Sequence, residues 1–334
     1  MAKKSVILAL QGGGSYGAFT WGVLDRLLKE KDLEVIGVSG ASAGAVNATC
    51  MVFGLIQNGN DGARKTLNDF WRKLSKLEKM SPFQQTLLDK MLSMGNINFN
   101  PIAMAADAMT SVLSPYQWNP LDINPMIEVL KEVVKDFDVI RQQDKVKMYL
   151  SATNVRTSDL KIFPYKEINA DKVMASACLP RMFKAVEIDG EYYWDGGFTG
   201  NPAMFPLIVN TKCKDLLIVE IESVNHGLPW TVKHIEEREA EISFNSSLMR
   251  EMDAIAMYNK GIDENKIIGE KVRMHYMNTG GLLNDYNRSA RYNISWEWLS
   301  FLHDKGYKTA SDWIKKNYSK IGEESSWIHP GLDK

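Results

Sequence analysis

Short apolar runs alternate with amphipathic stretches over the first sixty residues of the chain. Residues 5–10 and 35–38 are apolar runs of strand length, and residues 18–29 and 45–56 carry apolar side chains at helical spacing. Glycine-rich and small-residue turns separate them. The order strand, glycine loop, helix, strand, small-residue turn, helix predicts a parallel sheet covered by helices.

The pattern continues less regularly beyond residue 60. The pair Asp189-Gly190 lies between two β-type runs and predicts a type I′ hairpin. Other strands are predicted at residues 147–154, 160–163 and 216–221, and charged helices at residues 234–258, 294–304 and 309–317. Prolines interrupt a helical segment over residues 61–145, so we expect short helices there.

Five methionines lie between Met80 and Met109, within this interrupted helical segment. Methionine is an adaptable filler of hydrophobic cores, which favours ordinary helical packing. The alternative is an exposed apolar rim over an active site, as a lipid substrate would require. The sequence leaves both interpretations open.

Composition indicates a soluble globular protein. The net charge is −1, from 40 basic and 41 acidic residues, which argues against binding nucleic acid through a strong positive field. The N-terminal apolar run is shorter than the core of a signal peptide, and no run approaches the ~18 residues of a membrane span. We therefore expect a cytoplasmic protein, or one exported without a signal peptide, with at most peripheral membrane contact. Three widely spaced cysteines predict buried thiols and neither a disulfide framework nor a zinc site.

The pentapeptide Gly40-Ala41-Ser42-Ala43-Gly44 carries the strongest chemical signal. It matches G-x-S-x-G between a predicted strand and a predicted helix, where small neighbours permit a sharp turn that exposes a nucleophilic serine. The start of the next helix supplies backbone amides and a positive dipole end beside an oxyanion. The alternative is a simple helix N-cap.

A second glycine-rich segment, residues 11–17, follows the first predicted strand. One interpretation is an oxyanion hole in which the amides of Gly13, Gly14 and Ala43 converge. The other is a dinucleotide site, because Gly12, Gly14 and Gly17 fit G-x-G-x-x-G and acids follow at Asp32 and Glu34. The second strand argues against the dinucleotide site, since it runs into the serine turn and does not end in an acid.

A nucleophilic serine needs a base, and two kinds of candidate are present. The five histidines all fall in the charged C-terminal part, and His275 or His303 would complete a Ser-Asp-His triad. Asp195 is the better candidate for a base, because it follows the predicted hairpin and precedes two glycines that allow a tight turn. The alternative is that Asp195 simply forms this turn. A carboxylate has an ordinary pKa of ~3.9, so partial burial must raise it.

Four motifs in this order resemble the patatin-like phospholipase family, over roughly residues 5–222. They are Gly12–Gly17, Gly40–Gly44, Ala175-Ser-Ala-Cys-Leu-Pro180 and Asp195-Gly196-Gly197. The resemblance implies a three-layer α/β/α fold with a mostly parallel sheet and a catalytic domain over residues 5–222. The charged helical pattern that follows predicts a helical C-terminal region over residues 223–334, packed on this domain. The resemblance also implies that residues 175–180, up to Pro180, support the site.

The resemblance further implies the chemistry. Ser42 would be the nucleophile, Asp195 its base without a histidine, and Gly12, Gly13 and Gly14 the oxyanion loop, with no cofactor and no metal. The substrate would be a lipid or another acyl ester, and the sequence does not identify a protein partner. One departure is Tyr16, where many members carry arginine or lysine; if that cation helps bind anionic lipid, the help is expected to be missing here.

Overall fold

The computed structural model describes residues 3–222 and 228–331. Its strands are β1 (Lys4–Leu10), β2 (Leu33–Gly40), β3 (Lys147–Asn154), β4 (Leu160–Pro164), β5 (Val186–Ile188), β6 (Glu191–Asp195), β7 (Asp215–Val219) and β8 (Arg273–Met277). Its helices are α1 (Gly17–Leu27), α2 (Ala43–Lys76), α3 (Leu87–Leu92), α4 (Pro101–Val112), α5 (Pro115–Trp118), α6 (Pro125–Val133), α7 (Asp138–Gln142), α8 (Ala170–Ser176), α9 (Phe205–Asn210), α10 (Val232–Asp263) and α11 (Trp296–Asn317).

The eight strands of the described chain form one sheet in the order β5-β6-β3-β2-β1-β7-β8, with β4 paired to β3. Strands β3, β2, β1, β7 and β8 are parallel, and β4, β5 and β6 are antiparallel to their neighbours. Since β1 lies at the centre, both of its faces must be covered, which explains its unbroken apolar sequence.

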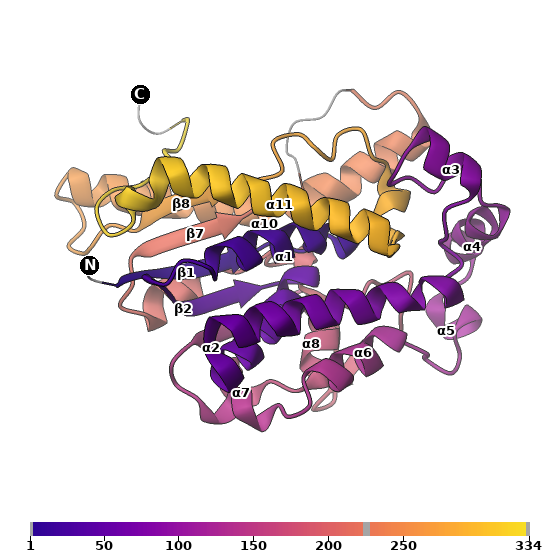
Figure 1. Ribbon diagram of the computed structural model, residues 1–334, viewed down its shortest axis with the longest axis horizontal. Coiled ribbons are helices and arrows are strands. Elements are labelled where there is room, and N and C mark those ends of the chain that lie inside the picture. Colours follow the sequence, from indigo (N-terminus) through magenta and orange to yellow (C-terminus); the bar gives the residue numbers. More distant parts are fainter. Residues whose placement is uncertain (1–2, 223–227, 332–334) are drawn as a thin grey trace.

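Alternate residues of β1 reach two separate cores. Val6, Leu8 and Leu10 pack in the core beneath α1, α2, α6 and α11. Ile7 and Ala9 pack in the opposite core with residues of α9 and α10. Figure 1 shows α1 and α11 crossing one face of the sheet with α10 behind it. The fold is therefore the three-layer α/β/α arrangement that was predicted.

Helix α11 packs along α1 at short range because glycines line the contact. A Cβ atom on Gly22 would overlap the carbonyl of His303, and one on Gly306 would overlap the carbonyl of Phe19. Gly306 lies within α11, so the two helices predicted at residues 294–304 and 309–317 are one helix. The close packing compensates for the low helix propensity of glycine.

Other elements agree with the predictions or extend them. Asp189 and Gly190 both have positive φ, 54° and 81°, as a type I′ turn requires, and the hairpin is confirmed. The helix expected to end near residue 56 bends at Asn58 and Gly59 and continues to Lys76. Strand β8 adds a parallel strand after residue 222, where only helices were predicted.

No helix in the described ranges is both long enough and apolar enough to cross a bilayer. The three cysteines, Cys50, Cys178 and Cys213, are buried and unpaired, as predicted.

Candidate active site

Ser42 occupies a strained turn between β2 and α2. Its φ is +53° and its ψ is −126°, a conformation that costs a serine about 1–3 kcal/mol. Glycine flanks the turn for steric reasons, since a Cβ atom on Gly40 would meet the Gly44 carbonyl and one on Gly44 would overlap the Leu10 carbonyl. The structure thus has the geometry expected of a nucleophile turn of the G-x-S-x-G type.

Helix α8 contacts this turn through hydrogen bonds to its last residue, Ser176. The backbone amide of Ser42 donates to the carbonyl oxygen of Ser176 at 3.0 Å and lies 3.2 Å from its hydroxyl oxygen. Ser176 belongs to the 175–180 motif, which therefore touches the site directly. Pro180 lies half-buried in the turn that follows α8.

Asp195 reaches the same region from the end of β6. Asp195 pairs with Ala152 of β3, and Gly40 of β2 pairs with Leu150 on the other side of the same strand. The Asp195 amide donates to the carbonyl of Cys178 at 2.8 Å. The carboxyl ends of β2 and β6 therefore pair with β3 at positions only two residues apart.

The carboxyl group of Asp195 is fully buried. Burial raises its pKa to about 7, whereas the Gly197 amide and the Ser42 hydroxyl lower it and the charge of Glu222 raises it. Oδ1 accepts from the Gly197 amide at 2.8 Å. Oδ2 has no partner at hydrogen-bond distance among the described residues. Ser42 is close enough to affect the carboxylate, so the structure brings these two predicted residues together.

The two glycines after Asp195 are required by close packing. A Cβ atom on Gly196 would overlap the carbonyl of Ser151, and one on Gly197 would overlap the ring of Phe244 from α10. Substitution at either position would move the Asp195 carboxylate.

The glycine loop after β1 lies against Ser42. A Cβ atom on Gly12 would overlap Cβ of Ser42. The Gly12 amide donates to Asn201 Oδ1 at 2.8 Å, so this amide already has a partner. The amides of Gly13, Gly14 and Ala43 donate to no residue in the described parts of the chain. Of the amides predicted to form an oxyanion hole, these three therefore have no partner within the described residues, whereas Gly12 has one.

Gly17 has a packing role at the start of α1. A Cβ atom there would lie 3.2 Å from the Trp71 ring and would overlap Cβ of Ala43. Asp32, in contrast, lies in the turn immediately before β2, where its carbonyl accepts from the Lys4 amide. The acid of a dinucleotide site would have to stand at the opposite end of this strand.

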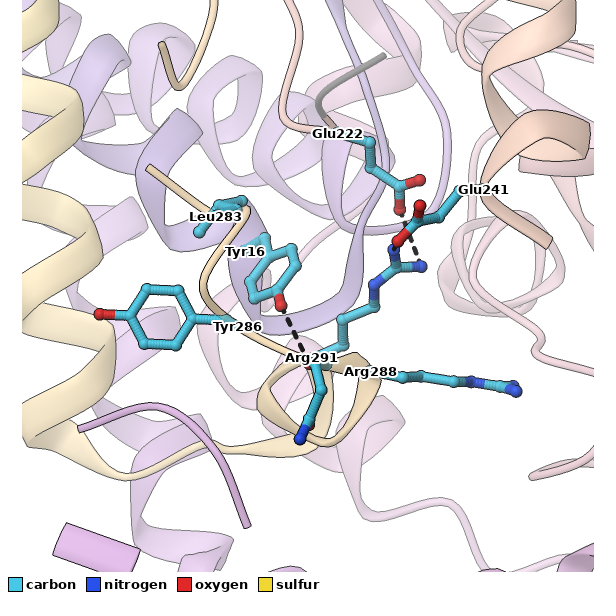
Figure 2. Close-up of a pocket in the computed structure, with 8 residues that line it drawn as sticks. Tyr16, Glu222, Glu241, Leu283, Tyr286, Arg288 and Arg291 are labelled. Carbon is cyan, nitrogen blue, oxygen red and sulfur yellow. Dashed lines mark hydrogen bonds and ion pairs between the residues drawn. The ribbon is translucent and has the colours of Figure 1, made fainter. Parts of the chain in front are cut away.

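A partly buried charge cluster next to the glycine loop was not predicted from the sequence. The Arg291 guanidinium lies 3.0 Å from Glu222 and 3.1 Å from Glu241, and 5.7 Å from the centre of the Tyr16 ring. Figure 2 shows these side chains converging on a pocket lined also by Leu283. Glu222 Oε1 would be 3.7 Å from a Cβ atom on Gly13. Although position 16 itself carries no cation, Arg291 from a distant segment lies beside Tyr16. This arginine is paired with the carboxylates of Glu222 and Glu241.

The candidate histidines have other partners. His275 lies between Asp215 and Ser326, near the amino ends of β7 and β8. His303 contacts Asp25 and Asp304 and packs on Trp21. His226 lies outside the described residues. The structure therefore does not bring His275 or His303 to Ser42.

A family model described as patatin-like phospholipase matches residues 8–208. The chain belongs to the patatin-like phospholipase family. This is a family of lipid acyl hydrolases, and the match spans the glycine loop, the serine turn and the Asp195 motif.

Solved structures also resemble this patatin-like chain, at low identity. VipD from Legionella pneumophila is 16% identical with a TM-score of 0.43, and the match covers 94% of this chain and 67% of VipD. The type III effector ExoU is 15% identical with a TM-score of 0.38, over 94% of this chain and 53% of ExoU. ExoU in its complex with SpcU, from Pseudomonas aeruginosa, is 14% identical with a TM-score of 0.30, over 74% of this chain and 51% of the other. No curated protein matches the chain.

Proposed function

We propose that the protein is a serine lipid acyl hydrolase that cleaves acyl esters of phospholipids or lysophospholipids through a Ser42–Asp195 dyad. The observation that carries the proposal is a strained serine turn next to a fully buried carboxyl group whose pKa is raised to about 7 by burial. A general base is most useful when its pKa lies near the working pH.

In the first step, Ser42 Oγ attacks the acyl carbonyl carbon while Asp195 Oδ2 takes the hydroxyl proton. The carbonyl oxygen becomes an oxyanion, and the amides of Gly13, Gly14 and Ala43 stabilise it. Each such donor typically contributes about 2.7–4 kcal/mol to transition-state stabilisation. The tetrahedral species collapses as the ester C–O bond breaks, and Asp195 returns the proton to the departing alcohol.

In the second step, water attacks the acyl-serine ester. Asp195 takes a proton from this water, and collapse of the second tetrahedral species returns a proton to Ser42 and releases the fatty acid. The step uses residues of the chain and water alone.

The test combines substitution with covalent labelling. Ser42→Ala and Asp195→Asn are each expected to abolish hydrolysis of a soluble short-chain ester, and a fluorophosphonate probe is expected to label wild type but not Ser42→Ala. His275→Ala and His303→Ala serve as controls and should retain turnover. Loss of activity in either histidine variant, with wild-type activity in Asp195→Asn, would replace the dyad by a histidine triad.

A further inference from the structure

The segment over residues 81–121 has an outer surface unlike the rest of the molecule. Three of its 41 residues are charged, Asp89, Lys90 and Asp107, against 24% of the whole chain. Asp89 is buried and accepts from the amides of Asn98 and Phe99. Only Lys90 and Asp107 therefore bring charge to the surface of this segment.

Large apolar side chains take the place of charges on this surface. We name it the apolar rim and define it by Leu87, Met91, Ile102, Met104, Val112 and Leu121, which are between 61% and 83% exposed. Helix α4 has a single buried residue, Ala103, and a single charged one. A helix that is apolar on nearly every side is normally covered by a core or by lipid.

The segment over residues 81–121, which carries the apolar rim, is hydrogen-bonded to segments on both sides of the candidate active site. On the glycine-loop side, the Ile97 amide donates to Ser289 Oγ at 2.8 Å, and Asn293 donates to the Gly95 carbonyl at 3.0 Å. On the Asp195 side, Lys184 donates to the Pro120 carbonyl at 2.8 Å. Figure 1 shows α3, α4 and α5 beyond the carboxyl ends of the central strands. Ser42 lies at this edge of the sheet, because it follows the carboxyl end of β2.

The composition of the rim favours lipid over a protein partner. Protein interfaces concentrate their binding energy in tryptophan, tyrosine and arginine anchors. The segment 81–121 contains no arginine, and its exposed apolar side chains are mainly aliphatic or methionine, with Phe99 and Tyr116 as aromatic exceptions. Aliphatic side chains on short helices suit insertion into the boundary between headgroups and acyl chains.

We infer that the apolar rim docks the protein on a lipid surface, so that an acyl ester passes from the lipid layer to Ser42 without crossing water. The inference rests on the proposed function, since it names the physical state of that substrate. Because charged groups are scarce on the rim, the attraction is apolar and insensitive to salt.

The experiment measures partitioning of full-length protein onto phosphatidylcholine vesicles by flotation. All proteins carry Ser42→Ala, so that the lipid stays intact and binding is separated from catalysis. The test variant adds Met91→Ser, Ile102→Ser and Val112→Ser. The matched control adds Val209→Ser, Met257→Ser and Ile268→Ser, which change equally exposed apolar residues on α9, on α10 and after α10.

The rim variant is expected to partition at least a hundredfold more weakly than its parent, because each buried aliphatic side chain accounts for about a tenfold change or more. The control variant should bind like the parent, and the parent should bind equally in 0.5 M salt. With Ser42 restored, the rim variant should hydrolyse a soluble ester at the wild-type rate and lose hydrolysis of vesicle lipid.

Two outcomes would overturn the inference. One is that the rim substitutions do not change vesicle binding, whether the parent and the variant bind equally or neither binds. The other is a parent dimer in sedimentation that the rim substitutions convert to monomer, which would assign the surface to a second copy of the chain. Failure of the proposed catalysis would show separately, as unchanged ester turnover in Ser42→Ala.

Discussion

Asp195→Asn is expected to stabilise the folded protein while it abolishes catalysis. Asparagine keeps the shape of the side chain, and its Oδ1 can accept from the Gly197 amide as the carboxylate does. Its amide nitrogen takes the place of Oδ2, which has no partner at hydrogen-bond distance among the described residues. The substitution therefore removes a buried charge and keeps the hydrogen bond from the Gly197 amide.

The magnitude follows from the pKa of the buried carboxyl group. Burial raises this pKa from 3.8 to about 7, and each unit corresponds to ~1.4 kcal/mol. Between these two values the folded state holds a proton that the unfolded state has lost, so stability falls as pH rises. The cost of ionised Asp195 reaches about 4 kcal/mol at pH 8 and vanishes below the unfolded pKa.

The assay is urea unfolding of wild type and Asp195→Asn at pH 5 and at pH 8. The stability advantage of the variant should grow by about 2–3 kcal/mol between these two pH values, because titrations common to both proteins cancel. In parallel, kcat/KM of wild type on a soluble ester should rise with pH through about 7. A stability difference that does not change with pH would show that the pKa of Asp195 is not raised by burial.

Three other substitutions probe the neighbours of the dyad. Glu222→Gln should lower the pKa of Asp195, because it removes a nearby negative charge, and the acid limb of the kcat/KM profile should move to lower pH. Gly12→Ala should reduce kcat at least a hundredfold in a steady-state assay, since its Cβ would overlap Ser42 and lie 2.8 Å from the Ala41 carbonyl. Ser42→Gly should be about 1 kcal/mol more stable to urea than Ser42→Ala, because glycine adopts φ +53° without strain.

Local sequence was sufficient to predict the structure of a segment where that segment determines its own backbone geometry. The Asp189-Gly190 turn was predictable because only a few residue types tolerate two successive positive φ values. The position of β1 followed from an apolar run whose length matches a buried strand, and β3 coincides with the strand predicted at residues 147–154. The local context of Asp195 made it a candidate base, but only the family resemblance implied that it acts with Ser42, since no local pattern relates residues so far apart.

The ion pair between Arg291 and Glu222 could not be predicted from the sequence. Arg291 lies 275 positions after Tyr16, and nothing in its neighbourhood distinguishes it from a surface arginine. Glu222 directly follows an apolar run, which suggested a strand end and no role at the glycine loop. Their pairing depends on the placement of a short 3₁₀ helix at residues 288–292, which is a tertiary property.

The site depends on residues well beyond the segment that matches the family. Gln11 precedes the glycine loop, and its side-chain oxygen accepts from the amides of Ile221 and Glu222 while its nitrogen donates to Asn245 of α10. Gly14 lies against Arg291, and a Cβ atom there would be 2.8 Å from the Arg291 carbonyl. A strained serine and a buried carboxyl group both destabilise the fold, so the surrounding contacts must offset them. Because those contacts come from α10 and from residues near 291, the C-terminal region is part of the machinery that holds the glycine loop in place.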